Sequence, residues 1–145
     1  MLLNKQTKIL IWLVLAVAFF GFIDATYLAV KFFNGTELNC GLTGGCNVVT
    51  TSEYATLFGI PVALLGSFFY ATILFLSLLF IDRQYKSLPK LLLALTATGF
   101  LMSLYFVSLQ LFVIDAICVY CMVSATTSTT LFILSALLVK SMRKS

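Results

Sequence analysis

Charge, histidine and proline are scarce in this chain of 145 residues: 10% of the residues are charged, two are proline and none is histidine. Water-soluble domains carry about 25% charged residues, so the low charge excludes a soluble fold. The missing histidine leaves no imidazole for haem, and the chain has no glycine-rich dinucleotide motif. What remains is 61% hydrophobic, which indicates an integral membrane protein.

Long apolar runs predict how the chain crosses the membrane. A spanning helix needs about 20 mostly apolar residues, and a backbone in lipid must pair internally, as helices or as a closed barrel. The runs show no alternation with period two, so they predict helices over residues 9–33, 58–81, 90–114 and 118–139. Short connections predict an all-α, four-helix antiparallel bundle that forms one domain over residues 1–145.

The helix starts carry their own signals. Pro61 and Pro89 stand near the starts of the second and third helices, and proline is tolerated in a first helical turn. The first run continues past Asp24 to Phe33, which favours an uncleaved helix over a signal peptide.

Lysine and arginine are distributed unevenly along the chain. All but Lys31 fall on one side of the predicted bundle: Lys5, Lys8, Arg83, Lys86, Lys90, Lys140, Arg143 and Lys144. Because basic residues favour the cytoplasmic side, we expect both termini in the cytoplasm of a cell (inner) membrane protein. The loop between the first two helices is then extracytoplasmic, where its short amphipathic stretch 50–55 is suited to cap the bundle.

The four cysteines fall in two short stretches that this topology places together outside the cytoplasm. Cys40 and Cys46 lie in the first loop, and Cys118 and Cys121 form a CxxC at the start of the last helix. Disulfides form and persist on that side. Four cysteines allow three pairings, and exchange between pairs proceeds through a mixed disulfide. The pattern predicts a thiol–disulfide relay, with Gly44-Gly45 as a mobile arm before Cys46.

Two other readings of the cysteines stay open. The first is a pair of purely structural disulfides, although a CxxC disulfide closes almost no loop and therefore stabilises a fold only weakly. A four-cysteine zinc site is the other, although an oxidising compartment disfavours free thiolates. A helix start favours redox chemistry, because its free amides stabilise a thiolate.

A relay also needs an electron acceptor. Without a nucleotide or haem motif, we expect a lipid-soluble quinone that reaches the CxxC from within the bundle. Aromatic side chains able to wall such a site are numerous: Phe58, Phe68, Phe69, Tyr70, Tyr105 and Phe106.

The motifs together resemble the vitamin K epoxide reductase family in its microbial form. The residues that carry the resemblance are Cys40-x5-Cys46, Val49, Ser52, Tyr54-Ala55, Phe58-Gly59-Ile60-Pro61, Gly66, Tyr70, Cys118-Val-Tyr-Cys121, Ser124 and Asp24-Ala25-Thr26-Tyr27-Leu28. The resemblance implies a four-helix bundle around a quinone, capped by the loop between the first two helices.

The resemblance also implies roles for the cysteines. Cys40 would exchange with a thioredoxin-like protein, Cys46 would pass electrons inward through a transient bond to Cys118, and Cys121 would face the quinone. Microbial members support disulfide formation in exported proteins. Many carry a fused thioredoxin-like domain; this chain stops at Ser145, so we expect a separate extracytoplasmic partner.

The expected quinone site departs from the vertebrate pattern. Vertebrate members have an asparagine on the second helix and a tyrosine four residues after the second CxxC cysteine. Here the second helix has no asparagine, and Ala125 takes the tyrosine's place. We therefore expect reduction of a quinone (menaquinone, ubiquinone or a vitamin K-type quinone) rather than of an epoxide, with no metal. The candidate quinone-binding residues are Phe58, Phe69, Tyr70, Tyr105 and Ser124.

Three alternative functions remain. One is reduction of vitamin K quinone or its epoxide on the same scaffold. Another is the unrelated four-helix, quinone-coupled thiol oxidase of Gram-negative bacteria, in which the CxxC lies in the first loop and not the second. From a different class comes a small four-helix multidrug transporter, which would use Asp24 as its membrane-buried carboxylate.

Overall fold

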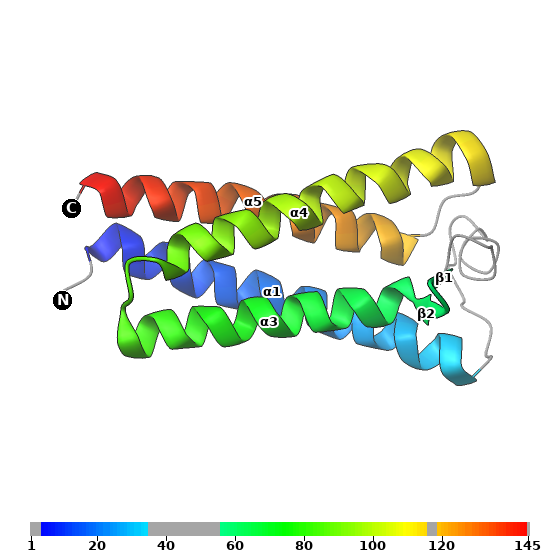
Figure 1. Ribbon diagram of the computed structural model, residues 1–145, viewed down its shortest axis with the longest axis horizontal. Helices are drawn as coiled ribbons and strands as arrows, with labels where there is room; N and C mark the ends of the chain where they lie inside the picture. The colour runs from blue at the N-terminus through cyan, green and yellow to red at the C-terminus, as the bar shows by residue number, and fades with distance from the viewer. Residues whose placement is uncertain (1–3, 35–55, 116–118, 145) are drawn as a thin grey trace.

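The computed structural model describes residues 4–34, 56–115 and 119–144, and four long helices dominate it (Figure 1). Their bounds are Lys5–Asn34 for α1, Val62–Arg83 for α3, Leu88–Leu109 for α4 and Val119–Lys144 for α5. All four are long and apolar enough to cross a membrane, α4 together with its continuation to residue 114. The expected all-α bundle of four helices is confirmed, and the chain is a multi-pass membrane protein.

A short hairpin precedes α3. Strands β1 (Thr56–Leu57) and β2 (Ile60–Pro61) pair antiparallel, and the two turn residues, Phe58 and Gly59, have φ of 55° and 82°. Two positive φ values suit a tight hairpin turn and do not fit a right-handed helix. The prediction of a helix from residue 58 is therefore wrong at its start, because α3 begins four residues later, at Val62.

The other helices extend beyond the apolar runs. α1 begins four residues before residue 9, and α5 continues five residues past 139. α4 begins two residues before 90 and has Pro89 in its first turn, as predicted. Hydropathy marks the stretch that suits lipid, whereas a helix that has started continues through polar residues until a cap or a break ends it.

The outer end of α4 is wound differently. The helix passes into a π-helical turn, η2 (Gln110–Ile114), in which the Asp115 amide donates to the carbonyl of Gln110. Asp115 has φ of 58° and ends the turn in the left-handed region. Such wide turns occur frequently at functional sites.

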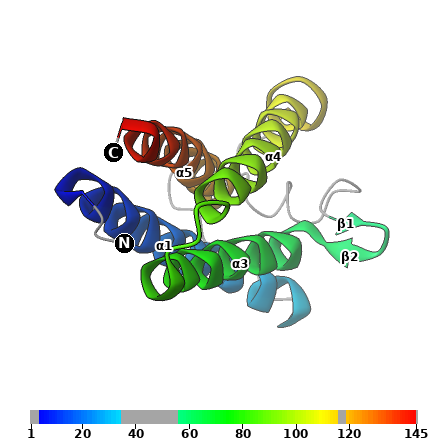
Figure 2. The ribbon, with the colours of Figure 1, turned by 60° about the vertical axis from the view of Figure 1, so that its left-hand side comes forward.

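The helices pack unequally. α1 lies along both α3 and α5, and α4 lies along α5, whereas the consecutive helices α3 and α4 share far fewer contacts (Figures 1 and 2). α3 and α4 diverge toward the end that carries β1 and β2 (Figure 1). The buried core fills mainly the opposite end, and its members are Leu10, Ile11, Val14, Ala18, Ala25, Tyr70, Ile73, Phe80, Leu88, Leu92, Leu131 and Leu138.

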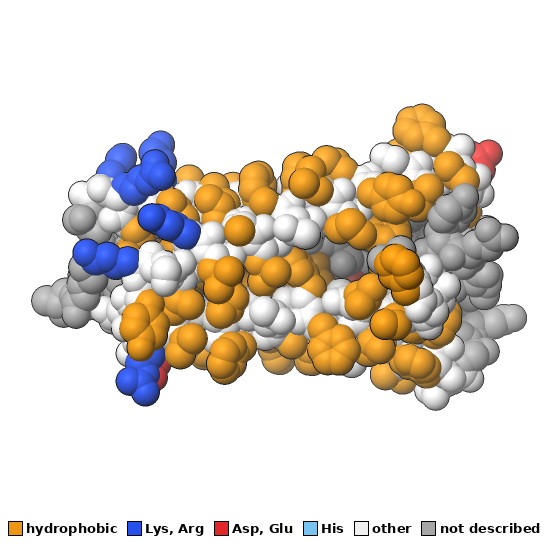
Figure 3. All heavy atoms as spheres, in the orientation of Figure 1, with side chains coloured by type: hydrophobic (Ala, Val, Ile, Leu, Met, Phe, Trp, Pro, Cys, Tyr) orange, Lys and Arg blue, Asp and Glu red, His pale blue; other side chains and the backbone are white. Residues whose placement is uncertain are grey.

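Charge is segregated along the bundle. Lysine and arginine side chains gather at the end where both termini lie, and hydrophobic side chains cover the middle (Figures 1 and 3). At the same end a buried hydrogen bond of 2.8 Å joins Thr7 of α1 to Ser141 of α5. The predicted cap loop and its amphipathic stretch fall on residues 35–55, outside the described residues.

Candidate functional site

A cavity of about 270 Å³ lies in the half of the bundle away from the termini. All four long helices contribute to its wall, together with η2 and Pro61 of β2. It is found where α3 and α4 diverge, so the weak packing between these two helices leaves room that the core end of the bundle lacks. The cavity is the candidate functional site.

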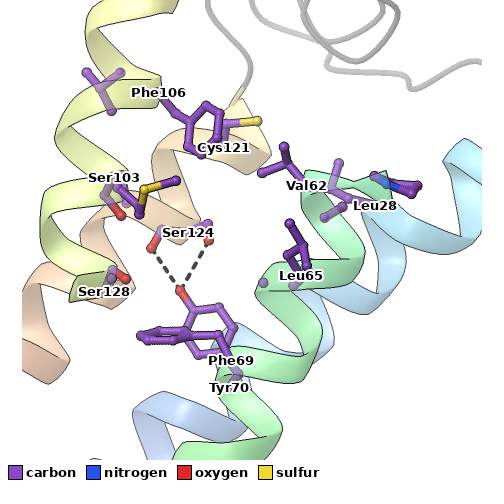
Figure 4. A pocket seen from close by; sticks show the side chains of 18 of the residues that line it. Leu28, Val62, Leu65, Phe69, Tyr70, Ser103, Phe106, Cys121, Ser124 and Ser128 are labelled. Atoms are coloured by element: carbon purple, nitrogen blue, oxygen red, sulfur yellow. Dashed lines mark hydrogen bonds between the residues drawn. The ribbon is translucent and has the colours of Figure 1, made fainter. Parts of the chain in front are cut away.

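Cys121 lines one end of the cavity. It lies in the first turn of α5, two residues after the helix begins at Val119. In Figure 4 its side chain lies beside Phe106 of α4 and across from Val62 of α3. The first amides of a helix have no partner within the helix and stabilise negative charge, so this position suits a thiolate.

Helix α1 supports the turn that carries Cys121. The ring of Tyr120, the residue before Cys121, lies 5.3 Å from the ring of Tyr27, centroid to centroid. The ammonium of Lys31 lies 5.6 Å from the centroid of the Tyr27 ring, a cation–π distance. The Tyr27–Tyr120 contact links the outer end of α1 to the first turn of α5, and Lys31 covers the Tyr27 ring from within α1.

Phe69 and Tyr70 close the other end of the cavity, away from Cys121 (Figure 4). Their rings meet edge to face with centroids 5.2 Å apart. The Tyr70 hydroxyl lies 3.0 Å from the carbonyl oxygen of Ser124, to which it donates, and 3.1 Å from its Oγ. Because Ser124 follows Cys121 by three residues on α5, this hydroxyl joins α3 to the helix that carries the thiol.

The chemistry of the wall suits the ring of a quinone. Most lining residues are apolar or aromatic, and the polar groups are few: hydroxyls such as those of Tyr70, Ser124 and Ser128, the Gln110 amide and the Cys121 thiol. Small-molecule sites have the same composition, and the cavity volume is near the lower end of their range, about 300 Å³. The cavity thus fits a quinone head group, with Tyr70 and Ser124 as candidate hydrogen-bonding groups and Phe69 as a wall.

The structure brings together only some of the residues predicted for the site. Cys121, Phe69, Tyr70 and Ser124 all line the cavity. Phe58 does not: it occupies the hairpin turn and is 97% exposed. Tyr105 of α4 is 52% exposed and also lies outside the lining. Ala125 lines the cavity in place of the vertebrate tyrosine.

The other three cysteines, Cys40, Cys46 and Cys118, lie outside the described residues. Their pairing and their predicted meeting with Cys121 stay predictions. The same holds for the mobile arm at Gly44-Gly45, which falls in the same stretch.

Two residues of the wall have a spacing that by itself indicates helix packing. Gly99 and Ser103 form a small-xxx-small pair on α4, yet both line the cavity. Such a pair looks the same in a sequence whether it faces a helix or a ligand. Gln110, 2% exposed, also lines the cavity and was missed, although a glutamine near the outer end of an apolar run was the available signal.

Asp24, the carboxylate within the first apolar run, is half-buried on α1. Its Oδ2 atom is buried and has no hydrogen-bond partner within the part of the chain that the structure describes. The residue is not among those that line the cavity. Two residues further along α1, the hydroxyl of Thr26 forms a hydrogen bond of 2.9 Å with the hydroxyl of Ser67 on α3.

Comparison with known proteins identifies the family. The sequence pattern of the vitamin K epoxide reductase family matches residues 12–136. The chain is also 32% identical over 124 residues to thiol-disulfide oxidoreductase LTO1 of Arabidopsis thaliana, a match that covers 78% of this chain and 32% of that relative. The chain thus spans about a third of the relative's length. It belongs to the vitamin K epoxide reductase family, whose members are membrane thiol–disulfide oxidoreductases.

Proposed function

We propose that this protein is a quinone-dependent thiol oxidase of the extracytoplasmic side of the membrane. The observation that carries the proposal is the position of Cys121, at one end of a largely apolar cavity whose other end carries the hydroxyls of Tyr70 and Ser124. Family membership adds support, since quinone use is general in the family. The proposal covers quinones as a class: menaquinone, ubiquinone or a vitamin K-type quinone.

Electrons follow the cysteines in two exchange steps. A thioredoxin-like partner gives up its dithiol and becomes a disulfide, while the Cys40–Cys46 disulfide becomes two thiols. Cys46 then attacks Cys118 and forms a mixed disulfide, which Cys40 resolves, leaving Cys118 and Cys121 reduced. Each exchange breaks one sulfur–sulfur bond and forms one, so no electrons are lost on the way.

The last step regenerates the Cys118–Cys121 disulfide and releases two electrons and two protons. A quinone held in the cavity would accept the two electrons and the two protons, which would convert it to the hydroquinone. The chain's own contribution is to place the Cys121 sulfur at the apolar cavity, to favour its thiolate at the helix start, and to hold Tyr70 through Ser124. The oxidised partner then passes its disulfide to exported proteins.

Two variants test the path through the CxxC. We expect Cys118→Ala and Cys121→Ala each to abolish quinone-dependent oxidation of reduced thioredoxin by the purified protein, because neither can form the second disulfide. Cys40→Ala should lose oxidation of thioredoxin while it retains much of the oxidation of dithiothreitol, a dithiol small enough to reduce the Cys118–Cys121 disulfide without Cys40. Turnover retained by either single CxxC variant contradicts the relay.

Asp24→Asn separates the enzyme from a transporter. The carboxylate is outside the cavity wall, so we expect the variant to keep quinone-dependent oxidation. A multidrug transporter would show the opposite sensitivity, with drug efflux that survives loss of all four cysteines and is lost in Asp24→Asn. Reduction of a vitamin K-type epoxide remains the alternative on the same site, measured by adding the epoxide in place of the quinone.

A further inference from the structure

The ring of Phe69 lies against a glycine of the neighbouring helix. A methyl group built on Gly99 of α4 would come within 2.8 Å of Cε2 and 3.1 Å of Cε1 of that ring, and closer still to Cζ. Carbon atoms without a bond between them do not approach so closely, because optimal contacts lie at about 3.5–4.0 Å. The missing side chain at position 99 is therefore what lets the Phe69 ring occupy its present place.

Phe69 has little freedom to yield toward the core. Its neighbour Tyr70 packs edge to face against it, is 1% exposed, and is held by its hydrogen bonds to Ser124. The Tyr70 ring is itself seated on a second glycine, since a methyl on Gly21 of α1 would lie 2.5 to 2.8 Å from three of its carbons. With Tyr70 fixed from two sides, the cavity that Phe69 lines is space into which its ring can move.

We propose that Gly99 is a specificity-determining residue of the quinone site: by holding no side chain, it keeps the Phe69 ring out of the cavity and so leaves room for a fused two-ring quinone. This inference rests on the proposed function. Cys121 and Phe69 line opposite ends of the cavity, so a quinone whose reacting ring meets the thiol extends its second ring toward Phe69 (Figure 4). A side chain at position 99 would push Phe69 into that space.

The test compares two quinones that differ by one fused ring, 2-methyl-1,4-naphthoquinone and 2-methyl-1,4-benzoquinone. Binding is measured as the concentration-dependent rise in Tm of the full chain in its oxidised form, so that no thiol adds to the quinone. A second readout is the single-turnover oxidation of the reduced CxxC. We expect Gly99→Ala to weaken binding of the naphthoquinone about tenfold and that of the benzoquinone less than about twofold.

Gly66→Ala is the matched control. Gly66 also lines the cavity, but its new methyl would meet only the Cβ of Ala25 at 3.6 Å, an ordinary contact that displaces no ring. We therefore expect this variant to change both affinities by the same factor. Replacing Phe69 by leucine in the Gly99→Ala background should restore naphthoquinone binding, because the shorter side chain gives way. Phe69→Trp, which enlarges the ring in place, should also weaken naphthoquinone binding more than benzoquinone binding. It replaces Gly99→Ala in the test if that variant does not fold.

The outcomes separate this inference from the proposed function. If the unaltered protein binds neither quinone, the proposed function fails. If it binds both, and neither Gly99→Ala nor Phe69→Trp discriminates between them, Gly99 does not set specificity. Equal discrimination by Gly66→Ala would also overturn the assignment to Gly99.

Discussion

The hydroxyl of Tyr70 joins two helices that both line the proposed quinone site. It bonds the carbonyl and the side chain of Ser124, one turn below the CxxC on α5, and its ring closes the cavity. Hydrogen bonds between membrane helices are worth about 0.6 kcal/mol on average, and intramolecular ones in general about 1 kcal/mol. One tyrosine thus supports both the wall of the site and the α3–α5 contact.

Tyr70→Phe tests this dual role. We expect the variant to lose about 1 kcal/mol of unfolding free energy, because the ring stays and only the two bonds to Ser124 are lost. Unfolding in a mixed micelle with increasing denaturing detergent measures the change. Thr72→Val is the control, since the Thr72 hydroxyl donates to the carbonyl of Phe68, four residues earlier on the same helix. Equal losses for the two variants would contradict an interhelical role.

The residues of the site were predictable where chemistry and position agree. Cys121, Tyr70 and Ser124 were named from the motif, and all three line the cavity. Phe58 belongs to the same motif, but its positive φ places it in the hairpin turn, outside the bundle. A phenylalanine in the sequence does not indicate a left-handed backbone conformation. The spacing of Gly99 and Ser103 indicates helix packing, and a sequence does not tell which neighbouring helices stand apart to leave a cavity.

Among the elements, α1 and α3 are held together by small residues at two levels. At Gly21 the α1 backbone receives the Tyr70 ring, and at Gly66 the α3 backbone faces Ala25. The two positions differ in the space next to the glycine. An added methyl at Gly21 would lie within 2.8 Å of three ring carbons, whereas an added methyl at Gly66 would lie 3.6 Å from the Cβ of Ala25. The same substitution should therefore act differently at each.

Gly21→Ala should destabilise the bundle by about 2 kcal/mol, because Tyr70 or a whole helix must move to admit the methyl. Gly66→Ala should cost nothing measurable, because the methyl fits and alanine favours a helix over glycine. The pair is compared by the same detergent unfolding. A Gly21→Ala protein as stable as the unaltered chain would contradict close packing of the Tyr70 ring on Gly21.

The helices themselves were readable from apolar runs and from Pro89, because lipid dictates their length and proline their starts. The ends of the helices were not predictable in this way, since α5 continues through Lys140 and Arg143 after the apolar run has ended. The hairpin before α3 depends on backbone angles at Phe58 and Gly59, which hydropathy does not report. The cavity depends on the divergence of α3 and α4, a property of the packed bundle alone.

For the whole molecule, the clustering of basic side chains at one end suggests its orientation in the membrane (Figure 3). Lysine and arginine favour the cytoplasmic side. The end with both termini and the α3–α4 connection would then face the cytoplasm, and the end with Cys121 would face outward.

Cysteine labelling on intact cells tests that orientation. In a background with all four native cysteines replaced by alanine, Asn34→Cys and Ser87→Cys place one thiol at an exposed position at each end. We expect a membrane-impermeant maleimide to label position 34 from outside and position 87 only after permeabilisation. The reverse pattern would put the thiol end of the cavity in the cytoplasm and remove the setting in which disulfides persist.

The relay itself is tested most directly by the redox state of the four cysteines in the pre-reduced protein, with and without added quinone, read by differential alkylation and mass spectrometry. Electron transfer from the CxxC to a quinone predicts that Cys118 and Cys121 become disulfide-bonded on addition, that Cys40 and Cys46 follow, and that Cys121→Ser blocks both. If Cys118 and Cys121 remain thiols in the presence of quinone, the cavity beside Cys121 does not serve this chemistry.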